Sequence, residues 1–514
     1  MTSPKSEADF YDNPVIPGFH PDPSVCRVGE DYYLVCSSFE YFPGVPLFHS
    51  RDLAHWRQIG NVLDRPSQLP LPADAMASDG IYAPTIRHHD GRFWMITTNV
   101  SHGGNFIVTA ERPEGPWSDP VWIDLPGIDP DLAWDSEGNC WCAFAGAHGP
   151  DFSGVQIARI DPEAGKVLEG PTPAWAGTGL QWPEAPHLYR VGEWWYLMIA
   201  EGGTERGHTV AMARSRSPRG PWEGAPGNPI LSHRSTNHPI QSTGHADLVT
   251  TPDGRWWMVL LATRPVGYSP KFHVLGRETF LTPVDWESDW PRVGPVKLRE
   301  RVPVAVTRAE AEPGRDDFDG PALDPRWISP RSRPEGTWSL EQRPGWLALH
   351  ATGSTLDRPG CTFLGRRQQH TASRTAVLLD HAAGRAGLSV RLDEGHHYDL
   401  EVADGQAQVI ARIGPLRQTV ATRAVPQGPV TLTVTTRPSR RWPAAEEPSG
   451  LHVAAPDYVA FHVGDDPEPL AELDGRYLST EVATGFTGRV IGMYVTEGTA
   501  WFDWFDHGPL EELE

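Results

Sequence analysis

The chain has 514 residues, with 44 Lys and Arg against 66 Asp and Glu, for a net charge of −22. Single hydrophobic cores stop growing near roughly 250–300 residues, so we expect at least two domains. So acidic a chain is a poor match for nucleic acid or an anionic membrane, and no apolar run approaches the about 20 residues of a membrane span. The N-terminal sequence lacks the apolar segment of a secretory signal, and five scattered cysteines do not make a disulfide framework. We therefore predict a cytoplasmic protein.

The secondary structure is predicted to be almost entirely β. Glycine and proline each occur 51 times, and tryptophan 21 times. Frequent Gly and Pro leave little room for long helices, since both disfavour helix interiors. Short aromatic and β-branched clusters such as DYYLVCSS and RWWMVLLA, bounded by Gly, Asp or Pro, are typical of strands.

A repeat fills the first three hundred residues. An aromatic strand follows a glycine turn five times, at intervals of 47 to 62 residues: at Gly29, Gly91, Gly138, Gly192 and Gly254. A second short strand precedes each turn, in HPDPSV, YAPTI, DPDLAW, EAPHLY and HADLV. Units of about 50 residues with about four strands each are typical of propeller blades. We predict a five-bladed β-propeller over residues 13–300, after an N-terminal tail over 1–12.

The remainder of the chain has a different sequence pattern. Residues 301–316 are charged and interrupted by proline, which indicates a linker. From Asp317 onward, strands alternate at hairpin spacing without the repeat. This pattern predicts an antiparallel, jelly-roll-like β-sandwich over residues 317–514.

The repeat also indicates an active site. Alignment of the five units places equivalent residues where each innermost strand begins: Asp22, Ala83, Asp129, Ala185 and His245. Glu184 and Tyr82 come one residue earlier in their units. Three carboxylates from three blades should meet in one small volume, where like charges raise one another's pKa. Glycoside hydrolysis uses such a set, with one carboxyl group as acid and another as base or nucleophile. An Asp before Pro at a strand start is commonly only a turn residue, but three equivalent positions favour a functional role.

Many motifs along both domains resemble glycoside hydrolase family 43, in its two-domain β-xylosidase branch. The motifs are NPVIPGFHPDPSV, SSFEYFPGVPLFHSRDLAHW, GIYAP, WPEAPHLY, AEGGT, GHADL and LGRETF. The resemblance implies an inverting, exo-acting hydrolase with Asp22 as general base, Glu184 as general acid and Asp129 as the residue that modulates the acid's pKa and positions it. Asp131 departs from the family pattern, which often has serine there, and competes with Asp129 for the third role.

The resemblance implies substrate contacts for five further residues: Phe39, Tyr82, His245, Arg277 and Phe486. Tyr82 stands where many relatives carry tryptophan, and Phe486 resembles an aromatic that the second domain directs toward the active site. In some relatives the residue matching His245 helps to hold a calcium ion through water. The resemblance thus leaves open a structural calcium near the propeller axis, while no cofactor is required for hydrolysis.

We therefore predict a β-xylosidase that releases xylose from the non-reducing ends of short β-1,4-xylooligosaccharides. An α-L-arabinofuranosidase, or an enzyme with both activities, is the alternative. A non-catalytic sugar-binding propeller would be expected to lack one of the three carboxylates, and none is lost. A glycoside phosphorylase would need a basic phosphate cluster, and only Arg277 is found. The expected partner is a soluble oligosaccharide, with no nucleic acid or membrane, and homo-oligomerisation is left open.

Overall fold

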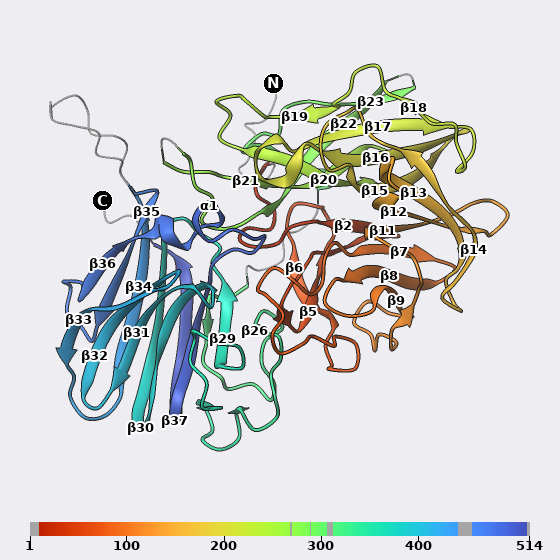
Figure 1. The fold of residues 1–514 in the computed structure, drawn as a ribbon. Coiled ribbons are helices and arrows are strands. Elements are labelled where there is room, and N and C mark those ends of the chain that lie inside the picture. The colour runs from red at the N-terminus through yellow and green to blue at the C-terminus, as the bar shows by residue number, and fades with distance from the viewer. Residues whose placement is uncertain (1–9, 268–269, 288, 306–311, 440–454, 511–514) are drawn as a thin grey trace, which may run out of the picture. The chain divides into compact units, whose positions relative to one another are not determined.

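The computed structural model describes residues 10–267, 270–287, 289–305, 312–439 and 455–510. It divides the chain into two compact units. The first comprises residues 1–72, 79–263 and 278–310; the second comprises 73–78, 264–277 and 311–514. Both units consist of strands, and the described residues form one four-residue α-helix, α1 (Thr480–Ala483) (Figure 1). No described helix is long and apolar enough to span a bilayer.

The first unit is a five-bladed β-propeller, as the repeat predicts. Each blade is an antiparallel sheet in which the strands follow chain order. The first two blades are β2 (Ser24–Val28), β3 (Asp31–Val35), β5 (Gly44–Ser50) and β6 (Arg57–Leu63), then β7 (Thr85–His89), β8 (Arg92–Asn99), β9 (Gly104–Ala110) and β10 (Val121–Trp122). The third is β11 (Ile128–Trp134), β12 (Cys140–His148), β13 (Phe152–Asp161) and β14 (Lys166–Trp175).

The fourth blade carries an extra short strand, and the fifth completes the ring. They are β15 (Glu184–Val191), β16 (Trp194–Glu201), β17 (Thr209–Ser215), β18 (Glu223–Gly224) and β19 (Leu231–Ser232), then β20 (Gln241–Thr250), β21 (Trp256–Thr263), β22 (Glu278–Glu287) and β23 (Trp290–Val293). The innermost strands contact one another in the order β2, β7, β11, β15, β20 and back to β2. The ring is therefore closed.

Alternating side chains on the central strands pack the blades together. On β8, Phe93 and Met95 join the cluster shared with the first blade, whereas Trp94 and Ile96 join the cluster shared with the third. Three further clusters fill the remaining interfaces between neighbouring blades. Since successive residues of a strand point to opposite faces, each such strand must be apolar on both faces. This requirement explains the aromatic and aliphatic runs of the repeat.

The glycine turns of the repeat are confirmed. All five predicted turn glycines have a positive φ, between 59° and 85°: Gly29, Gly91, Gly138, Gly192 and Gly254. This backbone region is open to glycine without steric cost.

The first described residues pair with β24 (Arg299–Arg301) and form hydrogen bonds with the fifth blade. Residues 10–12, which we expected in a tail, form strand β1 (Phe10–Asp12), which pairs with β24. The Tyr11 hydroxyl donates to the Leu281 carbonyl at 2.9 Å, and the Asn13 side chain both donates to that carbonyl and accepts from the Leu281 amide. The first residues of the propeller are thus held by its last blade. Residues 306–311 of the expected linker lie outside the described residues.

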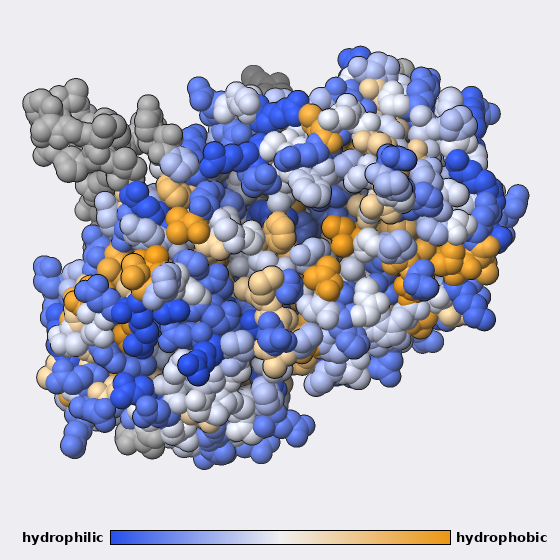
Figure 2. Space-filling view, viewed as in Figure 1, coloured by the Kyte–Doolittle hydropathy of each residue, from blue (hydrophilic) through white to orange (hydrophobic). Residues whose placement is uncertain are grey.

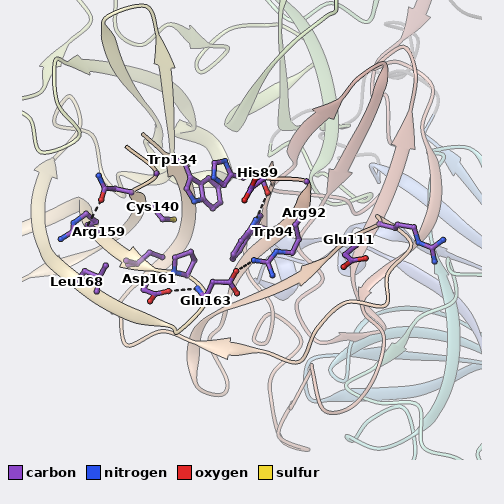
Figure 3. Close-up of a pocket in the computed structure, with 17 residues that line it drawn as sticks. His89, Arg92, Trp94, Glu111, Trp134, Cys140, Arg159, Asp161, Glu163 and Leu168 are labelled. Atoms are coloured by element: carbon purple, nitrogen blue, oxygen red, sulfur yellow. Dashed lines mark hydrogen bonds and ion pairs between the residues drawn. The ribbon is translucent and has the colours of Figure 1, made fainter. Parts of the chain in front are cut away.

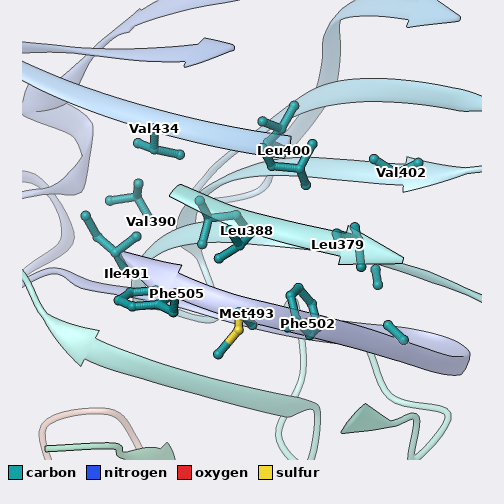
Figure 4. Packing of buried hydrophobic residues seen from close by; sticks show 14 of the residues in the cluster. Leu379, Leu388, Val390, Leu400, Val402, Val434, Ile491, Met493, Phe502 and Phe505 are labelled. Atoms are coloured by element: carbon teal, nitrogen blue, oxygen red, sulfur yellow. The ribbon is translucent and has the colours of Figure 1, made fainter. Parts of the chain in front are cut away.

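The second unit contains the predicted sandwich. Two long strands, β30 (Ser373–Asp393) and β37 (Val490–Pro509), pair with each other along most of their length. The first part of β30 also pairs with β34 (Val430–Pro438), and its last part with β31 (His396–Ala403). Register shifts at Asp380/Ala383 and Arg385/Ala386 separate the two parts, as expected where strands pass from one sheet of a sandwich to the other. Side chains from these strands, including Leu388, Leu400 and Phe502, fill the core (Figure 4).

The boundaries of the two units are not contiguous in sequence. Segments 73–78 and 264–277 group with the second unit, although we expected them within the propeller domain. The reason is visible in their hydrogen bonds: the Arg331 side chain donates to the Ala75 carbonyl at 2.7 Å, and the His273 ring contacts Glu481 at 2.6 Å. Hydrophilic residues cover most of the surface in view, with apolar residues in small separate areas (Figure 2).

Candidate active site

Four of the five residues that the repeat aligns share an unusual backbone conformation. Asp22, Asp129, Ala185 and His245 have φ values between 42° and 56°. Positive φ is uncommon for residues other than glycine and, where strained, is often found at functional sites. The ladders are irregular here too, with register shifts between Ile128 and Asp131 on β11 and between Glu184 and His187 on β15. The start of the innermost strands is therefore a distinct structural feature repeated around the ring.

Asp22 is held between the first and fifth blades. Its Oδ2 accepts a hydrogen bond from the Ser37 hydroxyl at 2.6 Å, and its Oδ1 lies 3.4 Å from Nδ1 of His245. Both Asp22 and His245 are buried. Burial and two fixed neighbours restrict the carboxylate to one orientation, which suits a group that must aim at a water molecule.

Glu184 begins β15 and is more open, with 23% of its side chain exposed. Its Oε1 lies 3.6 Å from Nε2 of the fully buried His208, while Nδ1 of that ring lies 3.4 Å from the Ser242 carbonyl. Because a carbonyl oxygen only accepts, Nδ1 carries the hydrogen in the neutral ring, which leaves a lone pair on Nε2 facing Glu184. His208 can thus accept a hydrogen bond from the acid form of Glu184 if the pair closes by a few tenths of an ångström.

Asp129 is adjacent to Glu184 through the backbone. Its Oδ2 accepts a hydrogen bond from the amide of Ala185 at 3.1 Å. The structure therefore brings Asp129 to the residue that follows Glu184, and Asp22 to His245.

Asp131 has different surroundings. It is fully buried, its Oδ1 accepts a 2.6 Å hydrogen bond from the Arg87 guanidinium, and its Oδ2 accepts one from the amide of Leu188 at 2.7 Å. Arg87 also donates to Asp247 at 2.8 Å and to Nδ1 of His187 at 2.9 Å. Asp131 therefore neutralises the partly buried Arg87, and its contacts indicate a structural part.

Asp247 shows how strongly Arg87 acts. Burial alone would raise the pKa of Asp247, but the charge of Arg87 and the hydrogen bonds from Arg87 and Tyr189 outweigh burial and hold that pKa below its ordinary value. The Ser24 hydroxyl also donates to Asp247, at 2.8 Å. One guanidinium thus satisfies two carboxylates from different blades.

These partners form a second layer, two residues further along each strand than the aligned positions. The second layer consists of Ser24, Thr85, Asp131, His187 and Asp247. Hydrogen bonds of Arg87 and Tyr189 join Asp131, His187 and Asp247, and Ser24 donates to Asp247. Our sequence reasoning did not find Arg87, His208 or Ser37. The second layer could have been found by moving the repeat alignment two residues along, since alternate residues of a strand share a face.

Two of the predicted substrate aromatics meet in the propeller. The rings of Phe39 and Tyr82 have centroids 5.3 Å apart, and the ring centroid of Phe19 lies 5.8 Å from that of Phe39. Phe39 is buried and has a φ of 49°.

Arg277 and Phe486 lie together in the second unit. The guanidinium carbon of Arg277 is 5.5 Å from the centre of the Phe486 ring, in the range of a cation–π contact. Phe486 is 37% exposed, so it is not a core residue of the sandwich. Its backbone amide donates a hydrogen bond to the Ser78 hydroxyl at 2.8 Å. Substrate binding by these two residues stays a prediction.

Comparison with known proteins assigns the chain to a family. Residues 11–291 match Glycosyl hydrolases family 43, and residues 315–507 match the Beta xylosidase C-terminal Concanavalin A-like domain. The chain belongs to glycoside hydrolase family 43. It is 40% identical to a non-reducing end alpha-L-arabinofuranosidase of Bacteroides ovatus, over 98% of this chain and 95% of the relative, and 38% identical to a xylosidase/arabinosidase of Butyrivibrio fibrisolvens, over 94% and 95%.

Solved structures agree with this family 43 assignment. The structure titled Bacteroides ovatus Xyloglucan PUL GH43B superimposes with a TM-score of 0.88 at 38% identity, covering 98% of this chain and all of the other. A xylan beta-1,4-xylosidase from Bacillus halodurans gives 0.85 at 31% identity, covering 97% and 99%. This family 43 chain is therefore a glycoside hydrolase with a five-bladed propeller and a C-terminal sandwich.

A structural calcium near the propeller axis, which His245 would help to hold through water, stays a prediction for the residues that the structure describes. Among those residues, no three His, Cys, Asp or Glu side chains form a group that could hold a metal. His245 faces Asp22, and the cation beside Asp131 and Asp247 is Arg87. No step below uses a metal.

A cavity of about 840 Å³ lies between the second and third blades, away from these carboxylates (Figure 3). It is lined by residues from the far ends of the strands, and His89 stacks on Trp134 there with ring centroids 4.3 Å apart. None of the predicted site residues lines it.

Proposed function

We propose that this enzyme removes a terminal pentose from the non-reducing end of short oligosaccharides with inversion at the anomeric carbon, and that its first substrates are β-1,4-xylooligosaccharides. The observation that carries the proposal is the set of three carboxylates at the starts of three innermost strands, in a chain of family 43. A cytoplasmic location remains a prediction that accompanies it.

In the proposed mechanism Glu184 donates its proton to the oxygen of the leaving sugar. Its partial exposure leaves room for that oxygen. Asp22, held by Ser37 and His245, removes a proton from water as the water attacks the anomeric carbon. Asp129 fixes the backbone beside Glu184 through the amide of Ala185 and places a negative charge near the acid. The bond to the leaving oxygen breaks as the bond to water forms, so the configuration inverts.

An α-L-arabinofuranosidase is the second candidate, and one observation favours it. The relative that is 40% identical over 98% of this chain is named for that activity, and the relative at 38% is named for both. An enzyme with both activities is consistent with either name.

The test measures hydrolysis of aryl β-D-xyloside, aryl α-L-arabinofuranoside and xylobiose, followed by proton NMR of the xylose first released from the aryl xyloside, which yields one sugar only. We expect hydrolysis of xylobiose, and α-xylose appearing first from the aryl β-D-xyloside. Initial β-xylose would refute inversion, and turnover of the arabinofuranoside alone would move the assignment to the second candidate.

A further inference from the structure

Trp182 is the least sheltered tryptophan near the predicted acid. It stands two residues before Glu184, is 65% exposed and has a φ of 54°. A bulky side chain in the left-handed region costs on the order of 1–3 kcal/mol. Exposure of an indole and backbone strain both oppose folding, so packing does not explain this residue.

The segment that presents Trp182 is held firmly. Glu201, fully buried at the end of β16, accepts hydrogen bonds from the Thr178 hydroxyl at 2.6 Å and from its amide at 2.9 Å. The carbonyl of Gln181 accepts from the amide of Gly202 at 2.7 Å. These contacts fix residues on the N-terminal side of Trp182, while β15 begins two residues after it. The exposed ring is therefore displayed from a fixed backbone.

The hairpin of β15 and β16, which follows Trp182, lies at the end of the fourth blade that carries Glu184. Glu184 pairs with Ala200 in the ladder between β15 and β16. The hairpin continues into the short π-helix η2 (Gly203–Gly207), whose Glu205 carbonyl accepts from the Ser242 hydroxyl of the fifth blade at 2.7 Å. Trp182 thus belongs to a rigid rim beside Glu184, built from the fourth and fifth blades.

The position of Trp182 relative to the acid suggests its ligand. A general acid contacts the oxygen of the leaving group, so the sugar that departs lies on the side of Glu184. Residues two apart in the chain are separated by at most about 7 Å between Cα atoms, which is within reach of that sugar. The C–H face of a pyranose packs well on a flat indole, whose large apolar face gains most from being covered.

We propose that Trp182 is the platform of a binding subsite for the leaving-group sugar of an oligosaccharide substrate. This inference rests on the proposed glycosidase function. It makes Trp182 a determinant of preference for oligosaccharides over glycosides with small leaving groups.

The experiment compares two leaving groups on the same terminal sugar. β-Xylosyl fluoride releases fluoride, which cannot touch Trp182, whereas xylobiose releases a sugar; the matching arabinofuranosyl pair is run alongside. For Trp182→Ala we expect kcat/KM on the disaccharide to fall by about tenfold or more, mainly through KM, with the fluoride unchanged. Trp182→Phe should retain most of the disaccharide activity.

Two outcomes would overturn the proposal, and they are distinguishable. If the wild-type enzyme hydrolyses neither substrate of either pair, the proposed function fails and the subsite fails with it. If the wild type hydrolyses both but Trp182→Ala loses both equally, or loses neither, only the subsite is refuted. Trp122, 36% exposed on β10 in the second blade, supplies the matched control: Trp122→Ala should leave the ratio of the two rates unchanged.

A stability measurement separates a subsite from a packing role. Trp182→Gly removes the left-handed strain, so we expect a melting temperature equal to or above that of the wild type together with the same loss on xylobiose. A clear fall in melting temperature with equal loss on both substrates would show that Trp182 serves packing, against the proposal.

Discussion

The innermost strands of the propeller carry two layers of polar residues with opposite surroundings. The first layer, where the strands begin, contains residues with positive φ: Asp22, Asp129, Ala185 and His245. The second layer, two residues along, is joined by hydrogen bonds through Arg87. Each layer contains two aspartates and a histidine. Residue type therefore does not distinguish the two layers, whereas their hydrogen-bond partners do.

The aspartates of β11 make the contrast sharpest. Asp129 accepts a hydrogen bond from the backbone amide next to Glu184, whereas Asp131 is paired with the partly buried guanidinium of Arg87. An ion pair inside a protein is fragile, because removing one partner leaves the other charge buried without compensation. The second layer should therefore respond to mutation through stability and the first through activity.

The largest effect is expected from removing the proposed acid and base. Glu184→Ala should lower kcat by about 10²–10⁴-fold on xylobiose but much less on an aryl xyloside, whose leaving group needs little protonation. Asp22→Ala should lower both alike, since water must be activated in either case. Rates on both substrates provide the measurement, and equal losses for Glu184→Ala would contradict its role as acid.

Loss of Arg87 tests the second layer directly. Arg87→Met leaves two buried carboxylates without their cation and should cost about 3–5 kcal/mol of unfolding free energy at pH 7. In the wild type the lowered pKa of Asp247 stabilises the folded state at pH values above the pKa of the unfolded state. This stabilisation is lost as the pH falls through the lower pKa of the folded state. In the variant the hydrogen bonds from Tyr189 and Ser24 remain, but the charge and the hydrogen bonds of Arg87 are lost, so the pKa of Asp247 rises from its wild-type value and acidification costs the variant less stability than the wild type.

The difference between the two proteins should therefore shrink between pH 7 and pH 5. Urea unfolding at both pH values measures it. A difference that is constant with pH would show that Arg87 contributes by packing rather than by its charge.

Matched substitutions of the two aspartates on β11 test the two layers separately. Asp129→Asn keeps an oxygen for the Ala185 amide but removes the charge, so we expect kcat to fall by about tenfold with little change in melting temperature. Asp131→Asn should instead lower the unfolding free energy by about 1–3 kcal/mol while the folded fraction keeps its kcat. The reverse pattern would assign the catalytic role to Asp131.

Sequence reasoning found the first layer because that layer is tied to the repeat. The position of Asp22, Asp129, Ala185 and His245 could be aligned from the five units, and the motifs supplied Glu184. Arg87, which joins the second layer, was missed because it bonds to residues from other blades, a relation that no local pattern encodes. The two noncontiguous segments of the second unit were missed for the same reason, since only tertiary hydrogen bonds reveal them.

The smallest effect is expected at Gly244, in the GHADL motif. A Cβ at this position would lie 2.2 Å from Nδ1 of His208, so Gly244→Ala must displace that ring and disturb its contact with Glu184. We expect kcat/KM to fall by about tenfold or less, because small displacements at a catalytic group have measurable effects. Gly60, where an added Cβ meets nothing within 4 Å, is the control, and Gly60→Ala should be silent. Equal activity of the two variants would mean that His208 has no part in positioning the acid.

The hydrogen bonds between the N-terminal residues and the fifth blade have a consequence for biosynthesis. Tyr11 and its partner Leu281 are 270 residues apart in the chain. At about 5–20 residues per second, a ribosome needs tens of seconds between making one and making the other. For most of that time Asp22 has been made but His245 has not, and the first blade has no complete fifth blade to pack against. Newly made chains therefore pass through a stage with exposed blade faces, and the end of the ring that carries the first layer is complete only when its last strands leave the ribosome.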